Sequence, residues 1–173
     1  MRTALTGAIL IAAVSTAGDF VWAGLQLRHR MVYGLAHGAA LFLCIGAFFG
    51  WLERKPLAGA LWGALIGLVA AGSFYLLAPA AGYGIMAVIW AFVWLAVAAL
   101  AGRVLSTARS WRETLTRAAL AMTGSGAAFF LISGIWRPFD PHGWDYAVHF
   151  FSWTVAYLPA FLALTLPRPA ASA

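Results

Sequence analysis

Charged residues are scarce in this sequence: only 9% of its 173 residues are Asp, Glu, Lys or Arg, and 5 residues are acidic. Hydrophobic residues make up 64% of the chain, and its mean hydropathy is +0.87. A soluble domain of this size needs far more polar side chains to cover its surface. The composition therefore excludes a soluble globular protein and predicts an integral membrane protein.

The sequence also lacks the usual motifs of several enzyme classes. Its one cysteine, Cys44, excludes an intramolecular disulfide and any CxxC motif. No GxSxG, HExxH or phosphate-binding glycine motif is present, so a serine hydrolase, a zinc peptidase or a nucleotide-binding protein is not indicated. The net charge is +6, but the arginines flank apolar segments and form no aromatic-basic surface, so no nucleic acid is expected as a partner.

Apolar segments of about 20 residues, the length of a membrane-spanning helix, recur along the chain. Proline, glycine and charge separate them. We therefore predict an all-α fold, with a six-transmembrane-helix bundle forming a single integral membrane domain over residues 1–173. The predicted spans are roughly 4–26, 31–51, 57–79, 84–102, 115–136 and 143–166. The first resembles a signal peptide at its start, but its apolar run continues, so we expect it to be retained.

The basic residues are distributed unequally between the two sides of such a bundle. With six spans both termini share one side, and the positive-inside rule places that side in the cytoplasm of a bacterial-type inner membrane. We expect a short interfacial helix in the longest connection, after the fourth span. The terminus-bearing side carries Arg2, Arg54, Lys55, Arg103, Arg109, Arg112, Arg117 and Arg168, and the other side carries Arg28, Arg30 and Arg137.

Small residues recur at a spacing of four in the third span, at Gly59, Gly63, Gly67 and Ala71. Such a stripe lets two helix backbones approach closely in lipid. It predicts either an interface between two copies of the chain or, as the favoured interpretation, close packing within one bundle. The chain is thus a candidate homo-oligomer or a subunit of a larger membrane complex.

Polar side chains gather near the side opposite the termini. In the stretch "FDPHGWDYAVHFFSW" over residues 139–153, an Asp-Pro pair predicts a helix start. At helical spacing His142, Asp145 and His149 then share a face. Asp140, His142 and Trp144 are explained by the outer lip of a membrane helix, whereas His149 lies deeper.

Two more ionisable residues, Asp19 and His37, lie at a similar depth, in the first and second spans. An aspartate inside a membrane costs about 2.5–3.5 kcal/mol, so Asp19 should face the bundle interior and have a partner, for which His37 is the nearest candidate. Ser73 and Tyr75 reach the same depth. We expect an outward-facing polar layer of Asp19, His37, Ser73, Tyr75 and His149 that binds or transports a small ligand, an ion or a proton.

Three other interpretations of this layer remain open. The polar side chains can form hydrogen-bonded clamps between helices, with no further function, as in a non-catalytic subunit. A divalent metal can be bound by His37, Asp145, His149 and Asp19. A b-type haem requires two facing histidines, for which His37 and His149 are the candidates. With either group the chain would be a metal- or haem-dependent membrane enzyme or redox protein. The aromatic side chains of the layer are also suited to binding a small ligand or a lipid. For the chain as a whole, the composition requires one partner, the lipid bilayer.

Overall fold

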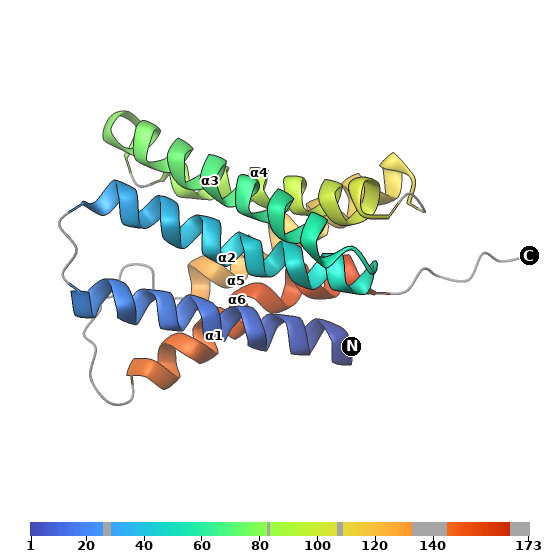
Figure 1. Ribbon diagram of the computed structural model, residues 1–173, viewed down its shortest axis with the longest axis horizontal. Coiled ribbons are helices and arrows are strands. Elements are labelled where there is room, and N and C mark those ends of the chain that lie inside the picture. Colours follow the sequence, from blue (N-terminus) through green and yellow to red (C-terminus); the bar gives the residue numbers. More distant parts are fainter. Residues whose placement is uncertain (26–28, 83, 107–108, 133–144, 167–173) are drawn as a thin grey trace, which may run out of the picture.

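The computed structural model describes residues 1–25, 29–82, 84–106, 109–132 and 145–166, and every regular element within these ranges is a helix (Figure 1). The predicted all-helical fold is thus confirmed. The elements are α1 (Arg2–Leu25), α2 (Arg30–Leu52), α3 (Pro56–Ala81), α4 (Ile85–Ala99), its π-helical continuation η1 (Leu100–Val104), α5 (Trp111–Ile132) and α6 (Asp145–Thr165).

Five of these elements are long and apolar enough to cross a membrane, when α4 and η1 are taken together. α5 has 22 residues but is more polar, since Arg112, Glu113 and Arg117 lie in its first two turns. It begins at Trp111, four residues before the predicted start, because the hydroxyl of Ser110 accepts the backbone N–H of Glu113 and caps the helix. The expected interfacial helix is absent from the described part of this connection, so that prediction is wrong.

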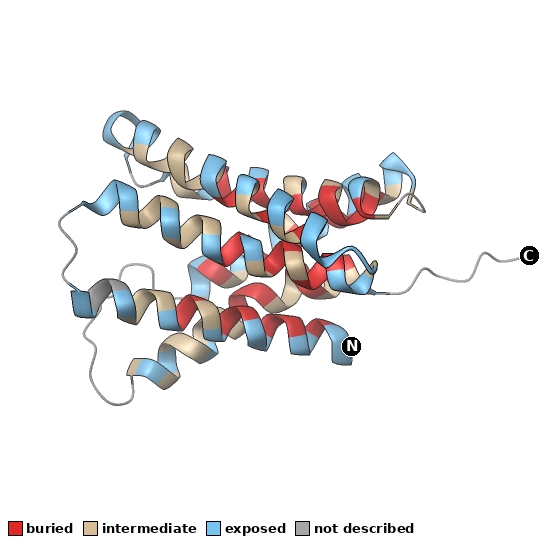
Figure 2. Ribbon diagram, viewed as in Figure 1, coloured by how far each residue is buried: buried red, intermediate tan, exposed pale blue. Residues whose placement is uncertain are grey.

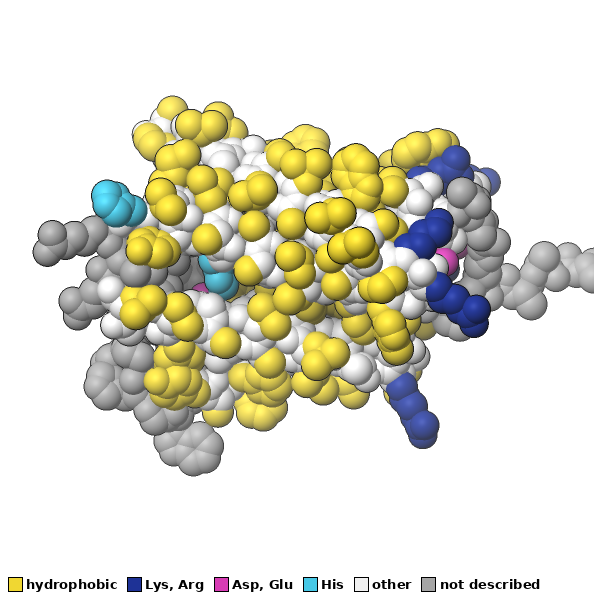
Figure 3. Space-filling view, in the orientation of Figure 1, with side chains coloured by type: hydrophobic (Ala, Val, Ile, Leu, Met, Phe, Trp, Pro, Cys, Tyr) yellow, Lys and Arg dark blue, Asp and Glu magenta, His cyan; other side chains and the backbone are white. Residues whose placement is uncertain are grey.

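The six helices close into a ring. Each helix packs against the next one in the chain, and α6 packs against α1. α1 begins and α6 ends at the same end of the bundle (Figure 1). This end carries seven of the described cationic side chains, and Figure 3 shows Lys and Arg gathered there, beyond a broad hydrophobic surface. We call it the basic end, and the opposite end, where α2 begins, the outer end.

The small-residue stripe of α3 packs inside the bundle. A Cβ atom added to Gly59 would collide with the backbone carbonyl of Gly46 in α2, and one on Gly63 would collide with that of Phe42. The two backbones therefore touch, which only glycine permits. The stripe thus joins α3 to α2, as the favoured interpretation predicts.

Pro159 interrupts the hydrogen-bond ladder of α6, and α5 accommodates it. Gly124 faces the proline ring, where a Cβ would lie 2.9 Å from the Pro159 Cβ atom. The hydroxyl of Ser125 donates a hydrogen bond to the Ala156 carbonyl, at 2.6 Å. A serine of a neighbouring helix thus supplies a donor near the interrupted turn, as is common in membrane helices.

The tightly packed core lies in the half of the bundle nearer the basic end (Figure 2). Its largest fully buried side chains include Ile45, Trp94, Tyr157 and Phe161. Toward the outer end most of the described side chains are only half-buried or exposed. The described side chains near the outer end are therefore less tightly packed than those of the half nearer the basic end.

Candidate functional site

The predicted polar layer is built on the contact between α1 and α6. Ser15 and Asp19 are four residues apart on α1, and His149, Trp153 and Tyr157 follow one another at the same spacing on α6. Residues four apart share a helix face. The two polar stripes therefore meet along the line where the helices pack, and Asp19 lies about 9 Å from the outer end of α1, at 1.5 Å per residue.

Two side chains of α6 approach the same carboxylate oxygen of Asp19. The indole Nε1–H of Trp153 donates a hydrogen bond to Asp19 Oδ2, at 2.7 Å. His149 Nδ1 lies 3.6 Å from this oxygen, which is ion-pair distance but longer than a hydrogen bond. The side chains of His149 and Asp19 are 26% and 27% exposed, so the pair lies mostly inside the bundle and is not fully enclosed by it.

His37 of α2 completes the group from the other side of α1. Its imidazole ring occupies the space where a Cβ of Gly18 would be. It is close enough to Asp19 to interact with it electrostatically. The described residues contain no direct hydrogen bond between His37 and Asp19, so Asp19 is bound from α6 rather than from its hairpin partner.

Below the Asp19 pair, a second polar contact lies deeper between the same helices. The hydroxyls of Ser15 and Tyr157 are 3.0 Å apart and fully buried. The Tyr157 ring stacks on that of Trp153, with centroids 5.5 Å apart. Trp90 and Trp94 of α4 contact the same tyrosine ring. The polar stripe therefore ends at a buried aromatic cluster.

Two aromatic side chains cover the site near the outer end. Phe20 of α1 stacks on Tyr146 of α6, and its ring also meets the edge of the His149 imidazole. Both contacts reduce the access of water to the Asp19 carboxylate.

The other predicted members of the layer lie apart from this pair. The Tyr75 ring packs over Gly34 of α2. Ser73 has no hydrogen bond to Asp19, His37 or His149 within the described residues, because α3 packs against α2 and α4. Asp145 is the first residue of α6, one turn from His149. Asp140, His142 and Trp144 lie outside the described residues.

The described side chains provide little support for the metal and haem alternatives. No group of three or more His, Cys, Asp or Glu side chains within the described ranges is arranged to hold a metal ion. The imidazole of His37 packs on Gly18, and that of His149 lies beside Asp19 and Phe20. Both histidines therefore contact α1, and neither contact indicates the open slot that a haem needs.

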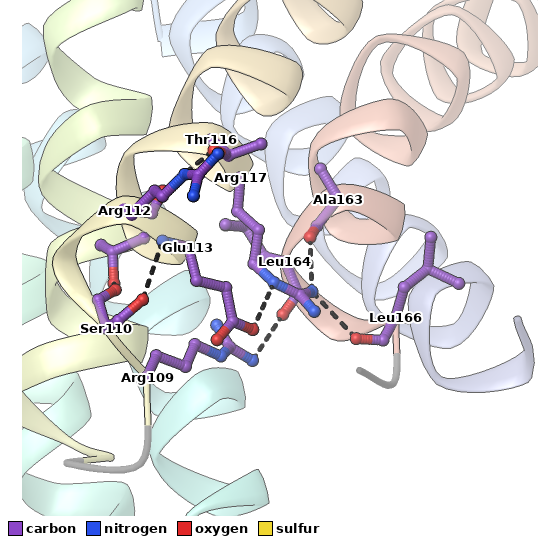
Figure 4. A network of polar contacts seen from close by, with 10 residues as sticks. Arg109, Ser110, Arg112, Glu113, Thr116, Arg117, Ala163, Leu164 and Leu166 are labelled. Carbon is purple, nitrogen blue, oxygen red and sulfur yellow. Dashed lines mark hydrogen bonds and ion pairs between the residues drawn. The ribbon is translucent and has the colours of Figure 1, made fainter. Parts of the chain in front are cut away.

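The sequence analysis missed Trp153, which it assigned no role. The signal was available, since Trp153 follows His149 by four residues and an indole N–H inside a membrane needs an acceptor. It also missed a polar network at the basic end, which Figure 4 shows.

In this network two arginines cap the end of α6. Arg117 of α5 donates to the carbonyls of Ala163 and Leu166 and forms an ion pair with Glu113, at 3.0 Å. Arg109 donates to the Leu164 carbonyl. The last carbonyls of a helix have no partner within it and carry the negative end of its dipole, so cations are favoured there.

Comparison with family models, with curated proteins and with solved structures found no match to this chain. The fold itself defines the broad class. It is a bundle of apolar helices compatible with a multi-pass membrane protein. Among the described residues, the Asp19 site and the cap of α6 are two places where polar side chains of different helices meet.

Proposed function

We propose that the protein binds a proton at the Asp19 and His149 pair, and that this proton controls how tightly α6 packs against α1. With the positive-inside assignment, the chain is a multi-pass protein of a bacterial-type inner membrane with both termini in the cytoplasm. The pair then responds to the medium outside the cell. We call Asp19, His149 and Trp153 the proton site.

One observation carries this proposal: a carboxylate and an imidazole lie 3.6 Å apart, each about a quarter exposed, near the outer end of the bundle. Histidine exchanges protons near neutral pH. An ionisable pair inside a membrane protein usually lies on a functional pathway, because its burial is costly. A proton is also the one ligand that needs no cavity.

Protonation of the pair changes the contact between α1 and α6. With Asp19 ionised and His149 protonated, the carboxylate attracts the imidazolium and accepts the Trp153 hydrogen bond as an anion. When Asp19 gains a proton, the imidazolium loses its counter-charge. Trp153 then binds a neutral acceptor, which forms a bond about half as strong. Acidification of the outer medium should therefore loosen α6 from α1.

The interior favours binding over transport across the membrane. Below Ser15 and Tyr157, the space between α1, α2 and α6 is filled by apolar side chains, including Ile45, Phe49 and Phe161. The polar stripe reaches the middle of the bundle and stops there. We therefore propose a proton site with access from the outer end only.

The experiment is infrared difference spectroscopy of the purified protein during a pH titration. The chain has 5 acidic residues, so the C=O band of a protonated carboxyl is readily assigned. Asp19→Asn should remove a carboxyl band that titrates together with an imidazole band, whereas Asp145→Asn, one turn from His149, should leave both bands unchanged. Identical titrations of the wild type and Asp19→Asn would contradict the proposal.

The second candidate function is a purely structural clamp, which the Trp153 and Ser15 hydrogen bonds favour. The variant Asp19→Asn distinguishes the proton site from the clamp. The amide oxygen of asparagine still accepts a hydrogen bond from the Trp153 indole N–H, but the amide does not take up a proton as a carboxylate does. A proton site predicts that this variant stays folded and that its stability loses its dependence on outer pH. A clamp predicts the same pH dependence in the variant as in the wild type.

A further inference from the structure

A cavity of about 260 Å³ lies at the basic end, far from the proton site. It is bounded by the start of α1, the end of α2, η1 and the end of α6. Its polar lining consists of Thr3, Glu53, Arg109 and Thr165, and Phe49 and Leu52 contribute to an apolar wall. The cavity is partly open and lies among the helix ends at the basic end of the bundle.

Glu53 is the unusual member of this lining. It lies at the C-terminal end of α2, where the helix dipole disfavours a negative charge. Its carboxylate forms no ion pair or hydrogen bond with any described residue. The adjacent Lys55 donates instead to the Leu105 carbonyl, at 2.7 Å. By contrast Glu113, the other described acidic residue at this end, is paired with Arg117.

Arg109 brings a positive charge to the same cavity. It donates one N–H to the Leu164 carbonyl, at 2.9 Å. A guanidinium has five N–H donors, so the bond to Leu164 does not by itself prevent Arg109 from facing an anion in the cavity. The threonine hydroxyls add two groups that can donate to an anion or accept from an ammonium group.

We propose that this cavity binds the head group of a phospholipid that carries a primary amine, such as phosphatidylethanolamine. The ammonium group lies against Glu53, and the phosphate lies against Arg109. A lipid head group and a soluble phosphoethanolamine share this chemistry, since both are zwitterions with an ammonium group and a phosphate. The lipid is favoured over a soluble zwitterion because the cavity lies at the helix ends and has an apolar wall.

The amine is the feature that Glu53 selects. A primary ammonium donates three hydrogen bonds, whereas a choline head group has a similar charge but no N–H donor. A glycerol head group has the phosphate and no cation. The site should therefore bind phosphatidylethanolamine more tightly than phosphatidylcholine and phosphatidylglycerol. One charge-assisted hydrogen bond corresponds to a difference in affinity of about tenfold.

The experiment uses the full-length protein in detergent, incubated with each of the three lipids and examined by native mass spectrometry. The wild type should retain phosphatidylethanolamine preferentially, and Glu53→Gln should abolish the preference over phosphatidylcholine. Arg109→Gln should weaken the binding of all three lipids. Asp19→Asn and Arg54→Gln are the matched controls, at the other end and beside Glu53, and should keep the preference.

A preference that survives in Glu53→Gln would overturn the proposal. Soluble phosphoethanolamine distinguishes the source of the ligand: if it displaces the lipid at equal concentration, the site binds a soluble zwitterion and the lipid assignment is wrong. Since Glu53 pairs with no described residue, Glu53→Gln should remain folded. Its thermal stability without added lipid should equal or slightly exceed that of the wild type, because a negative charge is unfavourable at the C-terminal end of α2.

Discussion

The indole N–H of Trp153 and the carboxylate of Asp19 form a 2.7 Å hydrogen bond that joins α6 to α1 inside the apolar bundle. This bond closes the ring of six helices near the outer end. It also holds the carboxylate oxygen that faces His149. In the proposed proton site, packing and proton binding are therefore coupled through one atom of Asp19.

A double-mutant cycle should measure this bond. Asp19→Ala and Trp153→Phe should each destabilise the protein, and their coupling free energy should be about 1 kcal/mol, the usual scale for hydrogen bonds between membrane helices. Unfolding in mixed detergent micelles, followed by circular dichroism, gives the four free energies.

Trp90→Phe is the matched control for this cycle. The Trp90 indole nitrogen is buried and has no hydrogen-bond partner within the described residues. Its coupling with Asp19→Ala should be close to zero. Equal coupling for Trp90 and Trp153 would show that the effect comes from aromatic packing and not from the hydrogen bond.

Alanine at Gly63 should separate α3 from α2. Its Cβ would collide with the Phe42 carbonyl, and overpacking of this kind costs about 1–3 kcal/mol. Gly72→Ala on the same helix should be neutral or slightly stabilising, because its Cβ would lie 3.7 Å from a Leu35 methyl group. Detergent unfolding of both variants tests the prediction, and equal losses would contradict the close approach of α2 and α3.

Arg117→Met should destabilise the protein more than Arg112→Met. Arg117 is buried and donates to two carbonyls of α6 and to Glu113. Its loss removes the donor to the two α6 carbonyls and breaks the ion pair with Glu113, and breaking a buried charge pair costs about 3–5 kcal/mol. Arg112 lies on the same helix but is exposed, and its replacement should change stability by about 0.5 kcal/mol or less. Thermal unfolding of the two variants gives the comparison.

Reporter fusions test the membrane orientation. A fusion after Ser110, in the connection at the basic end, should report the cytoplasm, and one after Gly82, between α3 and α4, should report the outside. The reverse pattern would place the proton site on the cytoplasmic face and the lipid cavity on the outer face. The structural contacts of both sites would be unaffected, but the proposed response to outer pH would be wrong.

Segment length and composition were enough to predict an all-helical fold with helices long and apolar enough to cross a membrane. Segment length and composition report directly on membrane helices, since each helix satisfies its own backbone hydrogen bonds within the bilayer. The free-energy cost of burying a charge also follows from the residue and its own segment, without knowledge of the neighbouring helices. It was therefore possible to infer that Asp19 needs a partner before any neighbour was known.

Only the tertiary structure decided which side chains meet. A helical pattern shows which residues share a face, but it does not give the rotation of one helix relative to another. For this reason His37, the nearest residue across a hairpin, was the expected partner of Asp19, whereas α6 supplies His149 and Trp153. The Arg117 cap depends in the same way on the contact of α5 with the end of α6, which no local pattern specifies.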